Sequence, residues 1–523
     1  MRNRLIICVT FLILWCSLIA QEAVPVGIVD LAELTLMENP IIRRNELTVS
    51  NAKGGYMMQK SAFDYRIFSS ASFIRNSLNL FAMDPRSSLT EGNLNTKNFI
   101  TSVGLTKRFR TGLSANVSIN HSTLNDNFQL NRFNENVGPN INDHILSSTL
   151  SITQPLMRGR GRSIATALEQ SAQFNLESSQ SNLTFANSVQ ILEYTTAYWQ
   201  YLAAHESADI YQQNELRVRK MLEVTEELVK GDIKPNGDLA QVKADLANQQ
   251  RLSNVARQNL NNVRLNLGRI VGLSEEESLM IGEPTNDFPT IEQSGYREGL
   301  QIDLLRQMAH DNRKDIESTQ FLKESLALQM RVANNDRKPQ FDLLGALNYG
   351  GASMGNSWSD AFSPFTNSQG RDVGVEVGLR FDFPINNNLA QGAYIQSKTL
   401  FQDQEVANAN LVRNVDLNVS IAVNNMENAV AILKNAQRSL DYYLEVYENE
   451  QTKFQNGLTT LLNLILFQER LTFAQLEYLQ AKQQFALSIV NLRFETGTLY
   501  SSGNSDTGSA TFNREVFYTI PLP

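Results

Sequence analysis

The chain has 523 residues, with 54 acidic against 46 basic side chains and a formal net charge of −8. This acidic balance, without a basic stripe, excludes the electrostatic footprint of a nucleic-acid-binding protein. Both cysteines, Cys8 and Cys16, lie in the first 20 residues. The remainder of the chain therefore has no thiol for a disulfide or a thiolate metal site, and its order must come from packing alone.

Residues 1–20 predict a secretory signal peptide. Arg2 and Arg4 precede an apolar run, and Ala20 stands before the expected cleavage point. The run is shorter than the ~20 apolar residues of a membrane-spanning helix, so a signal anchor is only an alternative. Lipoprotein processing at Cys16 is another alternative, although the bulky Trp15 stands where a small residue is expected. After residue 20 the chain either is soluble or crosses a membrane as a β-barrel, because no long uncharged apolar stretch remains.

The first half of the chain predicts a helical region followed by strands. Residues 28–61 are expected to be helical, and four later segments alternate apolar and polar residues with a period of two. Each segment has roughly the ten residues that a tilted strand needs to cross a bilayer. Arg110 to Gly112 form a tight turn, whereas the connections 76–96 and 124–144 are long and polar, an asymmetry typical of outer-membrane barrels. The four predicted strands are residues 65–75, 97–109, 113–123 and 145–155.

Residues 163–229 and 388–454 predict two very long helices, because they run almost without glycine or proline. Each would have on the order of 65 residues and a length of ~100 Å. Apolar residues at spacings of three and four indicate coiled-coil seams. A polar tip ends each long helix, and a helix of roughly 33 residues returns from it. The first tip contains Gly231, Pro235 and Gly237 and the second only Gly457, so the second should be tighter.

The second half repeats this order. Residues 273–297 hold two glycines and two prolines and predict a connector rather than a core. A second helical region at 298–335 and a long polar connection at 351–372 accompany two more strands, predicted at residues 340–350 and 373–383, and residues 500–523 form a C-terminal tail.

An internal duplication relates the two halves, residues 21–272 and 298–499. Shifting the first return helix by 225 positions superposes it on the second. A repeat of this length constrains the architecture before any single residue is interpreted. Matching pairs include Leu239 with Leu464, Leu246 with Leu471, and Gly272 with Gly497.

In this order the segments resemble the outer membrane efflux protein family, the TolC-like exit ducts of tripartite pumps and type I secretion systems. The resemblance covers nearly the whole chain after the leader. Its carriers are Asn39 and Pro40; Gln154, Pro155 and Leu156 ahead of Gly159 and Gly161; Ala309, Asn312, Arg313 and Asp315; Pro339; and the hairpins that carry Asp238 and Asn463.

The resemblance implies a membrane α+β fold in which three chains share one outer-membrane β-barrel, continued by a long antiparallel α-helical coiled-coil tunnel in the periplasm. Oligomerisation also agrees with the strands, since open sheet edges are not tolerated in lipid. The implied function is passive conduction of small molecules or secreted polypeptides, with no catalytic residue, cofactor or metal. A soluble periplasmic coiled-coil scaffold remains the alternative.

The resemblance also implies partners, namely a periplasmic adaptor and an inner-membrane transporter. The tips would dock the adaptor. The residues concerned are Gly231, Asp232, Pro235, Asn236 and Gly237 in the first tip and Asn456, Gly457, Leu458 and Thr459 in the second.

The chain departs from the family pattern in three places. Four strands rather than two precede the first long helix; alternatively, the hairpin around Arg110 to Gly112 lies outside the barrel. Where some members narrow the tunnel with carboxylates, this chain has Asn463 and Leu466. Asp238 remains in the first copy, either facing the tunnel or capping a helix. Finally, Lys314 stands where the family often has proline between Arg313 and Asp315.

Several motifs are not interpreted as catalytic or metal-binding. Residues 351–355 match the G-x-S-x-G nucleophile elbow around Ser353, but the following residues have loop composition, whereas the elbow requires a helix. The four histidines, residues 121, 144, 205 and 310, are scattered and form no metal-binding pattern.

Three further groups of residues have two interpretations each. Arg158, Arg160 and Arg162 are solvated boundary charges or bind lipid phosphate. Tyr198 and Trp199 pack in a helix seam or form a ligand platform. Tyr65, Phe73 and Phe99 belong to an interfacial aromatic girdle or are ordinary strand residues.

Overall fold

The computed structural model describes residues 24–88, 90–128, 141–232, 235–366, 371–500 and 512–521. These residues form two compact units. The strand unit comprises Asn51–Ser178 and Gln320–Val406, and the helical unit comprises the rest. The predicted signal peptide and the alternative lipidation site at Cys16 lie outside the described residues.

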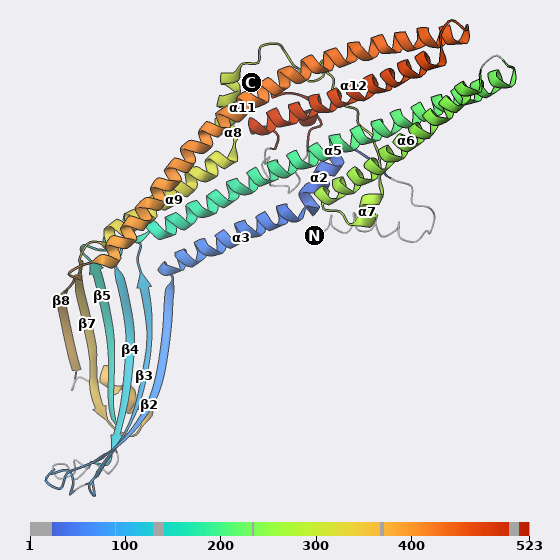
Figure 1. Cartoon of the computed structure of the whole chain (residues 1–523). Helices are drawn as coiled ribbons and strands as arrows, with labels where there is room; N and C mark the ends of the chain where they lie inside the picture. The colour runs from blue at the N-terminus through green and yellow to red at the C-terminus, as the bar shows by residue number, and fades with distance from the viewer. Residues whose placement is uncertain are drawn as a thin grey trace. The chain divides into compact units, whose positions relative to one another are not determined.

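Six strands form one antiparallel sheet in the order β2, β3, β4, β5, β7 and β8 (Figure 1). All six lie where the alternation predicts strands, and each is longer than predicted because the pairing continues into the adjoining connections. We call the end of the sheet at Tyr65 and Asp382 the helix end and the opposite end the loop end. The strands are β2 (Tyr65–Asn79), β3 (Asn93–Arg108), β4 (Ser114–Asp126), β5 (Asp143–Pro155), β7 (Gln340–Met354) and β8 (Arg371–Asp382).

The hairpin of β3 and β4 is an integral part of this sheet. Its turn lies where it was predicted, and Gly112 has a φ of +96°. A side chain at Gly112 would stand 2.7 Å from the carbonyl oxygen of Gly159, so glycine is required there. Because β3 also pairs with β2 and β4 with β5, the hairpin is continuous with the six-stranded sheet of this chain.

A helix, α10 (Trp358–Thr366), occupies the connection that loop composition predicted to be irregular, so that prediction was wrong. The Asp360 carboxylate accepts a hydrogen bond from the Ser357 backbone N–H at 2.9 Å and stabilises the first turn. The nucleophile elbow is nevertheless absent. Ser353 lies inside β7, and its hydroxyl donates to the carbonyl oxygen of Asp360.

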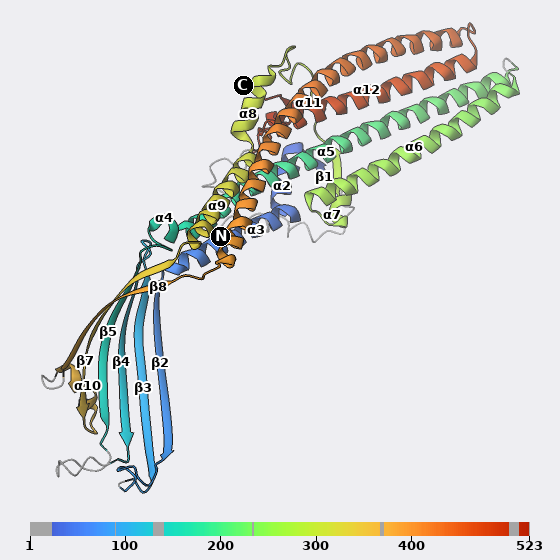
Figure 2. The same cartoon turned by 60° about the vertical axis from the view of Figure 1, so that its left-hand side comes forward.

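Both predicted long helices are present (Figures 1 and 2), the first broken at Thr166 into α4 and α5. Within the described ranges, no helix combines the length and the apolar character needed to cross a membrane. The helices are α2 (Ile28–Glu38), α3 (Pro40–Lys60), the 3-10 turn η2 (Ser61–Phe63), α4 (Arg162–Ala165), α5 (Ala167–Lys230), α6 (Asn236–Val271), α7 (Glu275–Leu279), α8 (Ile302–Asn312), α9 (Lys314–Asp336), α11 (Asn388–Gln455), α12 (Leu461–Glu495) and α13 (Glu515–Tyr518).

An aromatic cluster on α5 forms the centre of one core of the helical unit. Trp199 is fully buried, stacking on Phe288 and meeting Tyr518 edge to face. The buried hydroxyl of Tyr194 donates to the carbonyl oxygen of Ile28 at 2.6 Å, and burial raises the pKa of this phenol well above its usual range. The packing interpretation of Tyr198 and Trp199 is therefore confirmed.

The segment predicted to be only a connector, residues 273–297, belongs to this core. It contains α7 and β6 (Ile281–Pro284), and β6 pairs in parallel with β1 (Val24–Val26). Ile281 and Phe288 are buried in the aromatic cluster. The prediction failed because glycine and proline mark turns without showing whether the residues between them are buried. The C-terminal tail likewise contributes the buried Phe517 of α13.

Two helix junctions, one in each half of the chain, are met by left-handed glycines. Gly272, at the end of α6, lies against Glu38 and Asn39, and Gly497, just after α12, lies against Asn312 and Arg313. Both glycines have positive φ values, +101° and +70°. A Cβ at either position would approach the facing backbone within 3 Å, so a side chain there would separate the two helix ends.

Arg313 joins α8 and α9 through a buried ion network. Its guanidinium donates to both carboxylate oxygens of Asp315, at 3.1 and 2.8 Å, and to Glu495 at 2.6 Å. It also lies over the rings of Phe185 and Phe494, 5.5 Å from each centroid. Burial by itself would lower the pKa of Arg313, but the two carboxylates reverse this effect and hold the pKa above its usual value.

We predict that Arg313→Met strongly destabilises the helical unit. The substitution leaves two carboxylates facing each other without a cation, and breaking such a buried pair costs about 3 to 5 kcal/mol. The Arg313 side chain is only 6% exposed. The control is Arg43→Met, since Arg43 forms only an exposed ion pair with Glu46. Urea unfolding should separate the two variants; equal midpoints would contradict the assigned role of Arg313.

Candidate functional site

One face of the six-stranded sheet carries hydroxyl and amide side chains. Cross-strand register places Ser102 beside Asn120, and Asn120 beside Ser147. The Ser102 hydroxyl donates to the amide oxygen of Asn120 at 2.7 Å, and the Ser122 hydroxyl donates to Asn98 at 2.8 Å. Such side chains retain further hydrogen-bonding capacity for water. We call this surface the polar face.

The opposite face is aliphatic and aromatic, and we call it the apolar face. Register aligns Val117, Leu150, Leu347 and Val375 in one row across four strands. These side chains are exposed, and that of Val375 is 72% accessible. A contiguous apolar surface of this kind indicates contact with another apolar phase.

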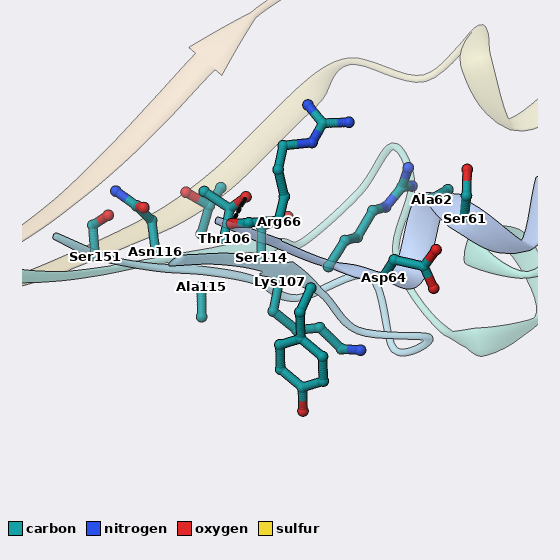
Figure 3. Close-up of a pocket in the computed structure, with 13 residues that line it drawn as sticks. Ser61, Ala62, Asp64, Arg66, Thr106, Lys107, Ser114, Ala115, Asn116 and Ser151 are labelled. Atoms are coloured by element: carbon teal, nitrogen blue, oxygen red, sulfur yellow. Dashed lines mark hydrogen bonds between the residues drawn. The ribbon is translucent and has the colours of Figure 1, made fainter. Parts of the chain in front are cut away.

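A groove of about 490 Å³ lies on the strands at the helix end (Figure 3). Arg66, Asn116 and Ser151 project from one side of the sheet there, whereas Lys107 and Ala115 project from the other. The Nζ atom of Lys107 donates to the carbonyl oxygen of Phe63 at 2.5 Å. On the polar face, the groove is lined by hydrophilic side chains, two of which are cationic, Arg66 and Arg108.

A chain of polar contacts crosses the helix end of the sheet. Arg158 donates to Gln340 at 2.6 Å, Gln340 donates to Asp342 at 2.7 Å, and Arg380 donates to the same Asp342 oxygen at 2.8 Å. Arg158 is thus half-buried and bonded to protein. Its neighbour Arg160 reaches only the Leu156 carbonyl oxygen, at 3.5 Å.

Two of the histidines that are scattered in the sequence lie together. His121 and His144 stack with ring centroids 5.5 Å apart. The two nitrogens of His144 contact Thr123 at 3.0 Å and the Gly355 carbonyl oxygen at 3.1 Å. In the part of the chain that the structure describes, no cluster of three or more His, Cys, Asp or Glu side chains is arranged to hold a metal.

The second tip connects α11 to α12 and is closed by its own side chains. Gly457 adopts a φ of +72°, and the Leu458 N–H donates to the Lys453 carbonyl oxygen at 2.8 Å, a helix-ending glycine motif. Thr459 donates to the Glu450 carboxylate, and the Asn463 amide donates back to Thr459 at 3.3 Å. Leu458 projects at the tip and is 77% exposed.

Among its described residues, the first tip has fewer such contacts. Its described residues Gly231, Asp232, Pro235, Asn236 and Gly237 are exposed, while residues 233 and 234 lie outside the described ranges. The helix α6 already begins at Asn236, so the last two of these residues belong to a helix. Five residues connect the helices at each tip, 231–235 and 456–460, so the prediction that the second is tighter was wrong in length.

The structure corrects the role of Asp238. The N-terminal cap of α6 is Pro235, without a side-chain hydrogen bond, and Asp238 lies in the first turn. Capping by Asp238 is therefore wrong, although a carboxylate there still complements the helix dipole. In the second copy, the Thr460 hydroxyl caps α12 by accepting from the Asn463 N–H at 3.3 Å. Asn463 and Leu466 are exposed on the first turns of α12.

A buried amide ladder joins three helices below the tips. Asn214 of α5 donates to Gln249 of α6 at 2.9 Å and accepts from Gln468 of α12 at 2.8 Å. Nearby apolar residues of the same helices, including Val218 and Leu464, form a separate core cluster. Sequence reasoning missed this ladder; its only signal was a set of polar residues at positions where a coiled-coil seam is normally apolar.

We predict that Thr459→Val loosens the second tip. The Thr459 hydrogen bond, followed by that of Lys453, lowers the pKa of the Glu450 carboxyl from its usual 4.5. Their combined stabilisation is complete above that usual value and is lost as the pH falls through the lowered pKa. At neutral pH, Thr459→Val should accelerate amide hydrogen exchange in residues 456–463, and this difference should vanish in acid.

The matched control is Thr452→Val, because the Thr452 hydroxyl bonds only within its own helix, to the Glu448 carbonyl oxygen. This variant should leave exchange at residues 456–463 unchanged. If Thr459→Val and wild type exchange equally at neutral pH, the hydroxyl–carboxylate bond does not hold the tip.

Comparisons with known proteins agree with this architecture. Residues 305–498 match the family model described as outer membrane efflux protein. The fold is similar to the Campylobacter jejuni CmeC outer membrane channel, with a TM-score of 0.64 and 14% identity, covering 90% of this chain and 85% of that one. It is also similar to the outer membrane protein VceC of Vibrio cholerae, with a TM-score of 0.63 and 13% identity, covering 90% and 96%.

A third similar structure is the open state of the Neisseria gonorrhoeae MtrE outer membrane channel. The TM-score is 0.59 at 14% identity, and the match covers 92% of this chain and 93% of that one. The sequence comparison with curated proteins finds no match.

Proposed function

We propose that this chain is a passive exit duct of the outer membrane. Residues 305–498 match the sequence pattern of the outer membrane efflux proteins, and the fold of the chain is similar to that of solved TolC-like channels. In this role it conducts solutes from the periplasm to the outside. The channel does no bond chemistry, and an inner-membrane transporter supplies the energy.

The main support for the proposal is that the sheet has one polar face and one apolar face. A polar face suits a water-filled lumen, and an apolar face suits lipid. The sheet has two unpaired edges, β2 and β8, and open edges are not tolerated in lipid. We infer that β8 of one chain pairs with β2 of the next, so that three copies close a single barrel.

The long helices supply the periplasmic part of the duct. In three copies, α5, α6, α11 and α12 would surround a tunnel, packed through seams like that of Val218 and Leu464. The two tips would dock a periplasmic adaptor, the first through Gly231, Asp232, Pro235, Asn236 and Gly237 and the second through Asn456 to Thr459. A change in how the two hairpins coil would open the tunnel.

The tunnel constriction would be weakly charged. Asp238 lies in the first turn of α6, and Asn463 and Leu466 lie in the first turns of α12. With a single carboxylate per chain among these three positions, the preference for cations should be modest. The hydroxyl and amide lining of the polar face selects no particular solute, so both small molecules and unfolded polypeptides fit the proposal.

We predict opposite effects for lysine at two adjacent positions of β7. Leu347 lies on the apolar face and Asn348 on the polar face. Leu347→Lys would place a charge in lipid at the middle of a strand, at a cost of about 2 to 4 kcal/mol. Asn348→Lys should insert normally and shift the selectivity of the channel toward anions.

Flotation with lipid vesicles and conductance in planar bilayers measure these effects. The proposal expects wild type and Asn348→Lys to float and Leu347→Lys to float poorly. A protein that stays in the aqueous fraction without detergent in all three forms would instead be a soluble scaffold.

We further predict that fixing the two tips to each other blocks export. The mature chain offers a thiol-free background, because Cys8 and Cys16 lie in the predicted leader. The double substitution Pro235→Cys and Thr459→Cys is cross-linked, and export is measured before and after reduction. Each single substitution is a control. Export that continues undiminished after complete cross-linking would contradict gating at the tips.

A further inference from the structure

A cavity of about 530 Å³ lies between α10 and the sheet. Its size falls within the range of about 300 to 1,000 Å³ that is typical of small-molecule sites. Residues of strands β3, β4 and β5 line one side of the cavity, and residues of α10 and of the segment before it line the other. Most of the lining is apolar, including Phe99, Val103, Ile119, Ala361 and Phe362.

Polar atoms on the cavity floor already have partners. Both nitrogens of His144 contact protein oxygens, one at Thr123 and one at Gly355. The ring of His144 stacks on that of His121, and both residues line the cavity. An occupant would therefore be held by apolar contact rather than by a dense set of hydrogen bonds.

The helix α10 is firmly attached over this cavity. The Ser353 hydroxyl of β7 donates to the Asp360 carbonyl oxygen at 2.5 Å. The ring of Phe365 stacks on Tyr349 with centroids 5.9 Å apart. These contacts hold α10 on the sheet, so the cavity is a regular feature of the fold.

The cavity opens on the apolar face. Register places Phe99, Thr123 and His144 in one row, two residues along the strands from the row of Thr101, His121 and Leu146. The same side of the sheet continues to Tyr349 and Val373. A solute passing along the polar face would not meet the cavity.

The position along the strands corresponds to a membrane interface. From Phe341 at the helix end to Tyr349 beneath α10 there are eight residue steps, or about 27 Å of strand, which rise about 19 to 22 Å at the usual strand tilt of about 35–45°. The apolar band of an outer-membrane barrel is about 25 Å tall and is bordered by aromatic side chains. The aromatic side chains of Trp358, 84% exposed, and Phe362 line the cavity from α10, as expected at such a border.

We propose that the cavity beneath α10 binds an acyl chain of a lipid in the outer leaflet, so that α10 clamps lipid against the side of the barrel. The inference rests on the proposed function, which assigns the apolar face to the membrane. A neighbouring copy of the chain is not the expected occupant, because the cavity lies over β3 to β5 and not over the edge strands β2 and β8.

Tryptophan fluorescence provides the test. Beyond the predicted leader the chain has two tryptophans, the fully buried Trp199 and the exposed Trp358. The full chain is reconstituted in vesicles of unbrominated phosphatidylcholine and titrated with a bromine-labelled fatty acid. The difference between wild type and Trp358→Phe isolates the emission of Trp358. We expect its quenching to saturate.

Two variants fill the cavity from opposite sides. Ala361, only 6% exposed, lines it from α10, and Val103 lines it from β3. Ala361→Leu and Val103→Phe should each raise the half-saturating concentration at least tenfold. The matched control Ser359→Leu adds the same kind of side chain at an exposed position of α10 outside the lining and should saturate as wild type does.

Two results would overturn the proposal. Quenching could rise linearly with fatty acid in wild type, or it could saturate at the same concentration in wild type and both filling variants. Either result would reflect general partitioning into the bilayer.

Flotation separates this failure from that of the proposed function. A chain that floats with vesicles but lacks the saturable site is a membrane channel without the lipid clamp. A chain that does not float refutes the membrane assignment itself.

Discussion

The strict alternation of side chains across one antiparallel sheet is the constraint on which the rest of the structure depends. Because successive residues point to opposite faces, a shift of one residue in register would move Leu347 to the polar face and Asn348 to the apolar face. Pairing along all six strands fixes that register. The proposed lumen, the proposed lipid surface and the cavity beneath α10 all follow from the same periodicity.

In the helical unit, long helices that have few buried residues along their length must be held together at particular places. An aromatic cluster around Trp199 and an ion network around Arg313 do so at two places. At the junctions, Gly272 and Gly497 let helix ends meet closely. Toward the tips, apolar packing is supplemented by the amide ladder of Asn214, and the second tip closes through Glu450 and Thr459. The two tips are equally long, and they differ in the hydrogen bonds that their described residues form.

The order of weak motifs predicted a resemblance to outer membrane efflux proteins, and the family model matches residues 305–498. The fold is similar to that of solved outer membrane channels. The strands and the long helices were predictable because both depend on local periodicity. The helix α10 was not, since Pro364 and several serines mask its apolar side, and its stability comes from Ser353 and Tyr349 on a neighbouring strand.

The sequence by itself determined the alternation of the strands and the lengths of the helices, since each is encoded by neighbours along the chain. Only the tertiary structure decided which distant residues meet. It placed Phe288 in the core instead of a connector, stacked His121 on His144, and showed that Asp238 does not cap its helix. Such contacts depend on the closure of long loops, for which local composition carries no signal.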